Sequence, residues 1–396
     1  MSGRLFQSIF LIVGTAIGAG ILALPISTVD AGFLGSTVGL LITWCFMTFS
    51  ALQLVKARLC FSEDIDIATM TTELLGRRVN ILIELAYLSL LLSLVSLYIT
   101  TGSSWVSDLI FSYSGLLIPP FLAQISFTFI IAFIIYQGMG NLANINQYIT
   151  SAKLFFLFMI IMTSFSFVEV KELEPYTFET IPKTLSMLLA IFGFASILPS
   201  LATHLNNSKK QLESSVLIGS IIILVCYILW EYVVFGVVGS HGLQTIANSQ
   251  DKGTEVIHAL SEIVNNSAFH TYGIGVIITA IMTSFLGVGH CLFSYLKDVL
   301  PIRHGRVNSL VAIFSGFLTP IIIINIYPSG ISSILGFAGI FVATILGILP
   351  SCMVLSKAYT ARAAPLNPLH RGLLWINIAF FSWVIFLELS HILQAF

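Results

Sequence analysis

The stretch of sequence that decides the fold lies near the amino terminus, where residues 13–25 read VGTAIGAGILALP. Inside a helix, glycine is unfavourable by about 1 kcal/mol and proline by about 3 kcal/mol, so this segment is weak near its middle. A related pattern, IFGFASILP, returns at residues 191–199. Both stretches lie inside long apolar segments, and we expect each to form a membrane-spanning helix with a break.

The composition places most of the chain in lipid. Of the 396 residues, 57% are hydrophobic and only 9% are charged, whereas a soluble domain carries roughly 25% charged residues. The formal net charge is −1, which leaves no surplus of basic residues for nucleic acid. Soluble enzymes, nucleic-acid-binding proteins and disordered proteins are therefore excluded. The five cysteines form no CxxC pair, so neither a disulfide framework nor a zinc site is indicated.

Eleven apolar segments are long enough to cross a bilayer, which takes about 20 helical residues. They are continuous blocks rather than alternating strands, which argues against a β-barrel. With the amino terminus in the cytoplasm, 13 of the 17 Lys and Arg residues lie inside, 3 lie outside and Lys153 lies in the membrane, as the positive-inside rule requires. The segments are residues 6–30, 34–56, 80–103, 120–137, 147–168, 183–203, 212–239, 272–296, 307–326, 329–356 and 372–394.

The two expected breaks lie in the first and sixth segments. An offset of five segments gives them opposite directions across the membrane, and paired interrupted segments are typical of transporters built from inverted repeats. We therefore expect one repeat at residues 1–168, a second at 169–356 and an additional helix within 357–396, all in one membrane domain. A single such segment would favour close helix packing instead, but two in register favour transport.

The breaks predict a binding site for a zwitterion. The half-helix that begins near Gly18 directs N–H groups at its break, which suits a carboxylate. The half-helix that ends near Phe192 offers carbonyl groups, which suit an ammonium group. Glycine also lets a ligand contact the backbone directly. From these two segments we expect substrate contacts at Thr15, Ala16, Gly18, Ala19, Gly20, Phe192, Gly193, Phe194, Ala195 and Ser196.

A stripe of hydroxyl groups marks the third segment. Ser89, Ser93, Ser96 and Thr100 are spaced by four, three and four residues, which places them on one helix face. Ser93 and Ser96 lie nearest the middle of the membrane, and we expect them to line the substrate site. The alternative is that small residues allow close packing of neighbouring helices.

The opening motif resembles the first helix of the bacterial hydroxy/aromatic amino acid permeases. The resemblance continues at residues 192–194 (FGF), 283–288 (TSFLGV), 335–340 (LGFAGI) and 347–350 (GILP). It implies an all-α integral membrane protein of eleven transmembrane helices: a LeuT-like 5+5 inverted repeat, with helices 1 and 6 broken, plus one extra carboxyl-terminal helix. It also implies proton-coupled import of an aromatic amino acid, most readily tyrosine, by an alternating-access symporter.

The sixth segment departs from this family. The aromatic permeases carry His-Gly after the Gly-Phe pair, whereas this chain has Ala195 and Ser196. Because these positions belong to the expected side-chain pocket, serine, threonine or another neutral amino acid is the alternative substrate.

Lys153, in the fifth segment, is the main candidate for ion coupling. A lysine inside a membrane is costly and therefore suggests a function. In related proton-coupled transporters a helix 5 lysine stands where sodium-coupled members bind a cation between helices 1 and 8. The resemblance places Lys153 there, beside Thr283 and Ser284, where it would gain and lose a proton as access alternates. Snorkelling of the side chain to the interface and coupling to sodium are the alternatives.

Two further titratable residues are weaker candidates for ion coupling. Glu231 lies in the seventh segment and His290 in the eighth. Each could relay protons, and each could equally be a hydrogen-bonded core residue. The roles of Glu84 and Glu388 stay open.

Functions outside transport find little support. The sequence contains no GxSG, HExxH or GxxxxGK[ST] motif, so a membrane-embedded enzyme is not expected, and the twin breaks argue against a channel. We expect an amino acid, protons and the lipid bilayer as partners, with no cofactor, metal or nucleic acid. The expected location is a bacterial inner membrane, with the amino terminus cytoplasmic and the carboxyl terminus periplasmic. The oligomeric state stays open.

Overall fold

The computed structural model describes residues 3–18, 20–63, 65–174, 177–247, 252–265, 267–300, 305–326, 338–363 and 365–394. Every regular element in these ranges is a helix, and none is a strand. The first half contains α1 (Gly3–Ala16), α2 (Gly20–Ser27), α3 (Gly32–Arg58), α4 (Ile67–Leu75), α5 (Arg77–Ser114), α6 (Pro120–Tyr136) and α7 (Met139–Ser164).

The second half begins with short 3-10 turns and continues with long helices. The turns are η1 (Phe165–Phe167), η2 (Val170–Leu173) and η3 (Phe178–Thr180). The helices are α8 (Ile181–Ile191), η4 (Gly193–Ile197), α9 (Leu198–His204), α10 (Lys209–Ala247), α11 (Lys252–Val264), α12 (Ser267–Val299), α13 (Gly305–Ile326), α15 (Ala338–Val342), η5 (Ala343–Ile348), α16 (Leu349–Leu355), α17 (Lys357–Arg362) and α18 (Pro368–Gln394).

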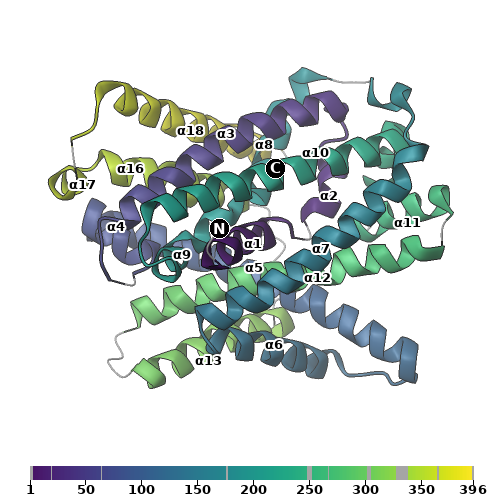
Figure 1. Cartoon of the computed structure of the whole chain (residues 1–396), viewed down its shortest axis with the longest axis horizontal. Coiled ribbons are helices and arrows are strands. Elements are labelled where there is room, and N and C mark those ends of the chain that lie inside the picture. Colours follow the sequence, from purple (N-terminus) through teal and green to yellow (C-terminus); the bar gives the residue numbers. More distant parts are fainter. Residues whose placement is uncertain are drawn as a thin grey trace.

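The long helices form a bundle around the first broken span. In Figure 1, α1 lies near the centre of the bundle, with α18 on one side and α6 and α13 on the opposite side. Helix α10 packs against α1, α2 and α3, whereas α12 packs against α1, α5 and α7. The breaks are therefore enclosed by protein, as unpaired backbone groups in a membrane require.

The apolar helices agree with the predicted all-α membrane architecture. Within the described residues, nine helical stretches are long and apolar enough to cross a membrane, and the bent pair of α1 and α2 adds a tenth. Each of the eleven predicted segments contains a helix. However, α6 has only 17 residues, and a straight span takes about 20, so the count of eleven stays a prediction. Residues 327–337, with part of the LGFAGI motif, lie outside the described ranges.

Both predicted breaks are present, and they differ in form. The first separates α1 from α2, which are bent by 49°. The second is the 3-10 turn η4, which begins at Gly193 between α8 and α9. Pro199 lies in the first turn of α9, where a proline loses no helical hydrogen bond. The repeat boundaries at residues 168 and 356 stay predictions.

The last helix, α18, supports an unusual turn in the tenth span. Ala343–Ile348 form a π-helical turn, a local widening that is frequent at functional sites. The Asn377 amide of α18 donates to the Gly347 carbonyl over 3.2 Å. From α3, the Ser50 hydroxyl lies 2.6 Å from the Leu346 carbonyl and 2.8 Å from that of Gly347. The turn is thus held from two sides.

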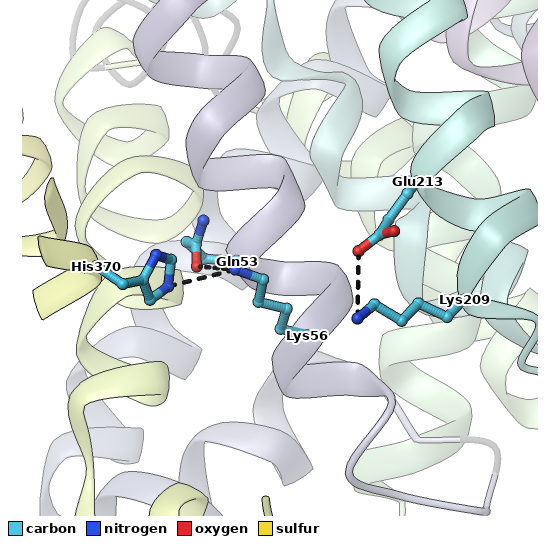
Figure 2. Close-up of polar contacts among 5 residues, drawn as sticks. All are labelled: Gln53, Lys56, Lys209, Glu213 and His370. Atoms are coloured by element: carbon cyan, nitrogen blue, oxygen red, sulfur yellow. Dashed lines mark hydrogen bonds and ion pairs between the residues drawn. The ribbon is translucent and has the colours of Figure 1, made fainter. Parts of the chain in front are cut away.

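Polar side chains join α3 and α18 at one end of the bundle. The Lys56 ammonium donates to Gln53 Oε1 over 3.3 Å and lies 3.3 Å from Nε2 of His370 (Figure 2). In the same view, Lys209 and Glu213 of α10 form an ion pair of 3.9 Å. Of these contacts, that between Lys56 and His370 connects the additional helix to α3.

Candidate functional site

The first break leaves carbonyl groups of span 1 without helical partners. Helix α1 ends at Ala16 and α2 begins at Gly20. The Gly18 N–H donates to the Ala16 carbonyl over 2.8 Å, not to the carbonyl of Gly14 four residues earlier. The oxygens of Gly14 and Ile17 are therefore available to side chains, and in a membrane they need such a partner.

The Lys153 ammonium fills this break. Its side chain is 0% exposed. Nζ donates to the carbonyls of Gly14 over 3.2 Å and Ile17 over 2.5 Å, and to Thr283 Oγ1 over 2.7 Å. All three N–H groups of the ammonium are thus used, and the positive charge lies at the negative end of α1. The side chain does not snorkel to the interface.

Helix α12 lies close to the break because glycine residues occur where the two helices meet. Ser284 Oγ lies 3.5 Å from the Gly14 carbonyl oxygen and 3.4 Å from that of Thr15. A Cβ atom at Gly18 would overlap the Ser284 hydroxyl, and one at Gly287 would overlap the Thr15 side chain. These glycines therefore allow α1 and α12 to lie this close. The three residues predicted for ion coupling lie together at this break: Lys153, Thr283 and Ser284.

Tyr227, which the sequence reasoning missed, joins the two breaks. Its side chain, from the middle of α10, is fully buried. The hydroxyl oxygen lies 2.9 Å from the carbonyl oxygen of Ala16 and 2.9 Å from that of Ile191, the last residues of α1 and α8. The ring meets that of Phe192 edge-on, with centroids 5.4 Å apart. The available signal was a phenol in an apolar segment, because a buried hydroxyl must find a partner.

A cavity of about 430 Å³ lies beside both breaks. Thr15 and Ser196 contribute hydroxyl groups to its wall, and so does Tyr98 of α5, which the sequence reasoning also missed. The lining extends to Lys183 at the start of α8 and to Glu388 of α18. Most other side chains in the wall are apolar, among them Leu90, Leu91, Leu94, Leu97, Met187, Val288, Val342 and Leu346.

The family model of the tryptophan/tyrosine permeases matches residues 1–389, almost the whole chain. The chain belongs to the tryptophan/tyrosine permease family. This permease is 28% identical to tyrosine-specific transport system 1 of Haemophilus influenzae over 91% of this chain and 89% of the relative. It is 25% identical to the tryptophan-specific transport protein of Shigella flexneri (89% and 86% covered). It is 26% identical to glutamine transporter 2 of Aliivibrio fischeri (94% and 93% covered).

The permease also matches a solved structure over its whole length. The crystal structure of MhsT in complex with L-phenylalanine gives a TM-score of 0.71 at 14% identity, and covers 100% of this chain and 99% of that one. The LeuT-like fold is therefore confirmed, and the family model confirms the resemblance seen in the sequence. The chain is a multi-pass membrane permease rather than an enzyme.

Only part of the predicted substrate set lines the cavity of the permease. Phe192, Phe194 and Ala195 are fully buried and lie outside its wall, because the 3-10 turn has three residues per turn and presents only every third side chain to one side. Ala19 lies outside the described residues. The predicted residues that do line the cavity are Thr15, Ala16, Gly18, Gly20, Gly193 and Ser196.

The α5 serines lie outside the wall of this cavity, and their contact with the substrate stays a prediction. Ser93 is 4% exposed and Ser96 is 1% exposed, but neither lines the cavity, whose wall on this helix includes Leu94 and Tyr98. The Ser93 hydroxyl donates to the carbonyl of Ser89 over 2.8 Å. A helical serine can bond its own backbone in this way, so its hydroxyl does not require a polar cavity.

The weaker ion-coupling candidates lie apart from Lys153. Glu231 is 0% exposed and its Oε1 accepts a hydrogen bond from Thr28 over 2.9 Å. His290 lines a second cavity of about 310 Å³. Among the described residues, no group of three or more His, Cys, Asp or Glu side chains could hold a metal ion. Other titratable residues that line the second cavity are Asp66, His204, Lys297 and Asp298.

Proposed function

We propose that the permease imports an aromatic amino acid, most readily tyrosine, in symport with protons and by alternating access. The observation that carries proton coupling is Lys153, whose ammonium has three acceptors at the first break. A neutral amine has only two N–H groups and a lone pair, which would face an oxygen atom. The gain or loss of a proton on Lys153 therefore changes the bonding between α1, α7 and α12.

The shape of the cavity supports an amino acid with a large side chain. The N–H groups at the start of α2 suit a carboxylate, and the carbonyl end of α8 suits an ammonium group. The volume of about 430 Å³ lies within the usual range of roughly 300–1,000 Å³ for small-molecule sites. Leu94 and Leu97 give α5 an apolar wall, which favours an aromatic side chain over that of serine.

The relatives support the same ranking of substrates. Two of those compared are named for tyrosine and tryptophan. A third, similar over 94% of this chain, is named for glutamine, which makes another neutral amino acid the second candidate. Ser196, the cavity-lining residue where the aromatic permeases differ, is a hydroxyl that such a side chain could contact.

The two cavities support alternating access. Val288 lines the central cavity and His290 lines the second one, so a short stretch of α12 lies between them. We place Lys183 and Glu388 on the periplasmic side and the His290 cavity on the cytoplasmic side of a bacterial inner membrane. The amino terminus is then cytoplasmic and the carboxyl terminus periplasmic. An alkaline phosphatase fused to the carboxyl terminus should be active, and an inactive fusion would reverse this orientation.

Transport by the purified protein in liposomes tests the proposal. Radiolabelled tyrosine should accumulate when an inward proton gradient is imposed in sodium-free buffer, and a protonophore should stop it. Tryptophan and phenylalanine should compete better than glutamine or serine. Uptake that requires sodium and ignores the proton gradient would refute proton coupling. Stronger competition by glutamine would instead favour the second candidate substrate.

A further inference from the structure

One side chain connects the two broken spans without lining the cavity between them. Tyr227 lies on α10, which packs against α1 and α2. Its hydroxyl reaches the carbonyl oxygens of Ala16 and Ile191, each over 2.9 Å. Among the described residues, it is the one side chain with hydrogen-bonding distances to both breaks. Those two carbonyl oxygens are separated by 175 positions in the sequence but are held by one hydroxyl group.

The two carbonyl oxygens that Tyr227 contacts lie at the ends of helices. Ala16 ends α1 and Ile191 ends α8, and carbonyl groups in the last turn of a helix lack an intrahelical partner. Both also lie at the negative ends of their helix dipoles. In a protein interior an unpaired carbonyl is costly. The Ala16 carbonyl also accepts from the Gly18 N–H over 2.8 Å, so the phenol is a second donor at Ala16 and can supply a donor at Ile191.

The phenol has one proton and two acceptors. It can donate to only one carbonyl at a time, and a rotation of the O–H bond transfers the hydrogen bond from Ala16 to Ile191. If α1 and α8 move apart, one of the two carbonyls can therefore keep its donor. A separation of the breaks at Tyr227 can then proceed while the phenol keeps its one hydrogen bond.

The same two carbonyl-bearing residues belong to the cavity wall. Ala16 and Ile191 both line the cavity, and Tyr227 lies behind them. The distance between the breaks sets the width of the cavity at this level. Tyr227 therefore acts on a bound substrate only through the backbone that it holds.

We propose that Tyr227 is a positioning residue that fixes the spacing of the two breaks, and thereby sets substrate affinity and the separation of α1 from α8. This proposal rests on the proposed transport function. The substitution Tyr227→Phe removes the hydroxyl but keeps the ring that packs on Phe192. Tyr232→Phe, on the same helix, is the matched control, because Tyr232 contacts the rings of Phe33 and Phe165.

Binding and uptake of radiolabelled tyrosine provide the first test. Tyr227→Phe should raise both Kd and KM about tenfold, the change that corresponds to one lost buried hydrogen bond, while Tyr232→Phe leaves both unchanged. Incorporation of 3-fluorotyrosine at position 227 makes the hydroxyl a stronger donor with little change in shape, and it should lower KM. A KM of Tyr227→Phe within about twofold of the parent overturns the proposal, and so does an equal rise in Phe192→Leu, which changes only the packing.

A distance measurement tests the spacing independently of the substrate. Spin labels at Phe6→Cys in α1 and Lys183→Cys in α8, in a background without the native cysteines, report the distance between the two helices. The distance distribution should broaden in Tyr227→Phe and not in Tyr232→Phe. This result would stand even if tyrosine proved not to be the substrate. An unchanged distribution in Tyr227→Phe overturns the proposal.

Discussion

Replacing Lys153 by methionine gives the most informative perturbation of this permease. Methionine has a similar length and no charge, so it occupies the space beside α1 but donates nothing to the carbonyls of Gly14 and Ile17. The variant removes the one cation that the described structure places at the first break. It therefore separates the proton-binding role of the side chain from its role in packing.

The expected size of the effect follows from the contacts. Hydrogen bonds from a charged donor contribute about 1.5–3 kcal/mol each, so the two carbonyl contacts amount to about 3–6 kcal/mol. Burying the ammonium costs several kcal/mol in return, so the free energy of unfolding should change by less than the bonds alone suggest. Proton coupling should be lost completely in Lys153→Met, because the thioether of methionine does not gain or lose a proton. With one proton per substrate, a gradient of one pH unit supports about tenfold accumulation, and this ratio should fall to about one.

The assay is uptake of radiolabelled tyrosine into liposomes with and without a pH gradient, combined with exchange of labelled for unlabelled tyrosine. Lys153→Met should lose gradient-driven accumulation and its stimulation by external acid, while exchange, which needs no net proton movement, persists. Lys210→Met, an exposed lysine at the start of α10, should behave like the parent protein. The reasoning is wrong if Lys153→Met still concentrates tyrosine when a proton gradient is imposed.

Two further substitutions test the site. Gly18→Ala places a methyl group on the Ser284 hydroxyl, so equilibrium binding of tyrosine should weaken at least about tenfold. The control Gly140→Ala, which has open space around it, should bind tyrosine normally. Equal binding by both variants would mean that α1 and α12 adjust freely. Glu231→Gln keeps the acceptor for the Thr28 hydroxyl, so thermal unfolding in detergent and proton-driven uptake should both stay close to those of the parent. A loss of uptake without a loss of stability would identify Glu231 as a proton relay.

The broken spans and Lys153 could be predicted because their signals are local. Three glycines and a proline weaken a helix wherever it packs, and a lysine in an apolar segment requires an acceptor whatever the rest of the fold. The contact of Lys153 with Thr283 joins residues far apart in sequence. It was predictable only through the family resemblance, which places helix 5 beside helices 1 and 8.

The faces of the cavity were harder to predict. Ser93 and Ser96 are correctly spaced for one face of α5, but spacing does not say which face meets the cavity. The face that carries Leu94 and Leu97 lines it. At the second break, the prediction named every residue from Phe192 to Ser196, because the sequence indicated a break but not its geometry. The 3-10 turn brings only Gly193 and Ser196 of these to the cavity. The hydrogen bonds of Tyr227 depend on tertiary packing, which no periodicity reveals.

The π-helical turn in the tenth span links α18 to the wall of the cavity. Leu346 of this turn lines the cavity, and Asn377 of α18 holds the neighbouring carbonyl of Gly347. A Cβ atom at Gly347 would overlap the ring of Phe381, so α18 presses directly on the turn. Changes at Asn377 or Phe381, which do not line the cavity, can thus shift Leu346. Substitutions on α18 outside the cavity can therefore change the shape of the cavity while the residues in its wall stay the same.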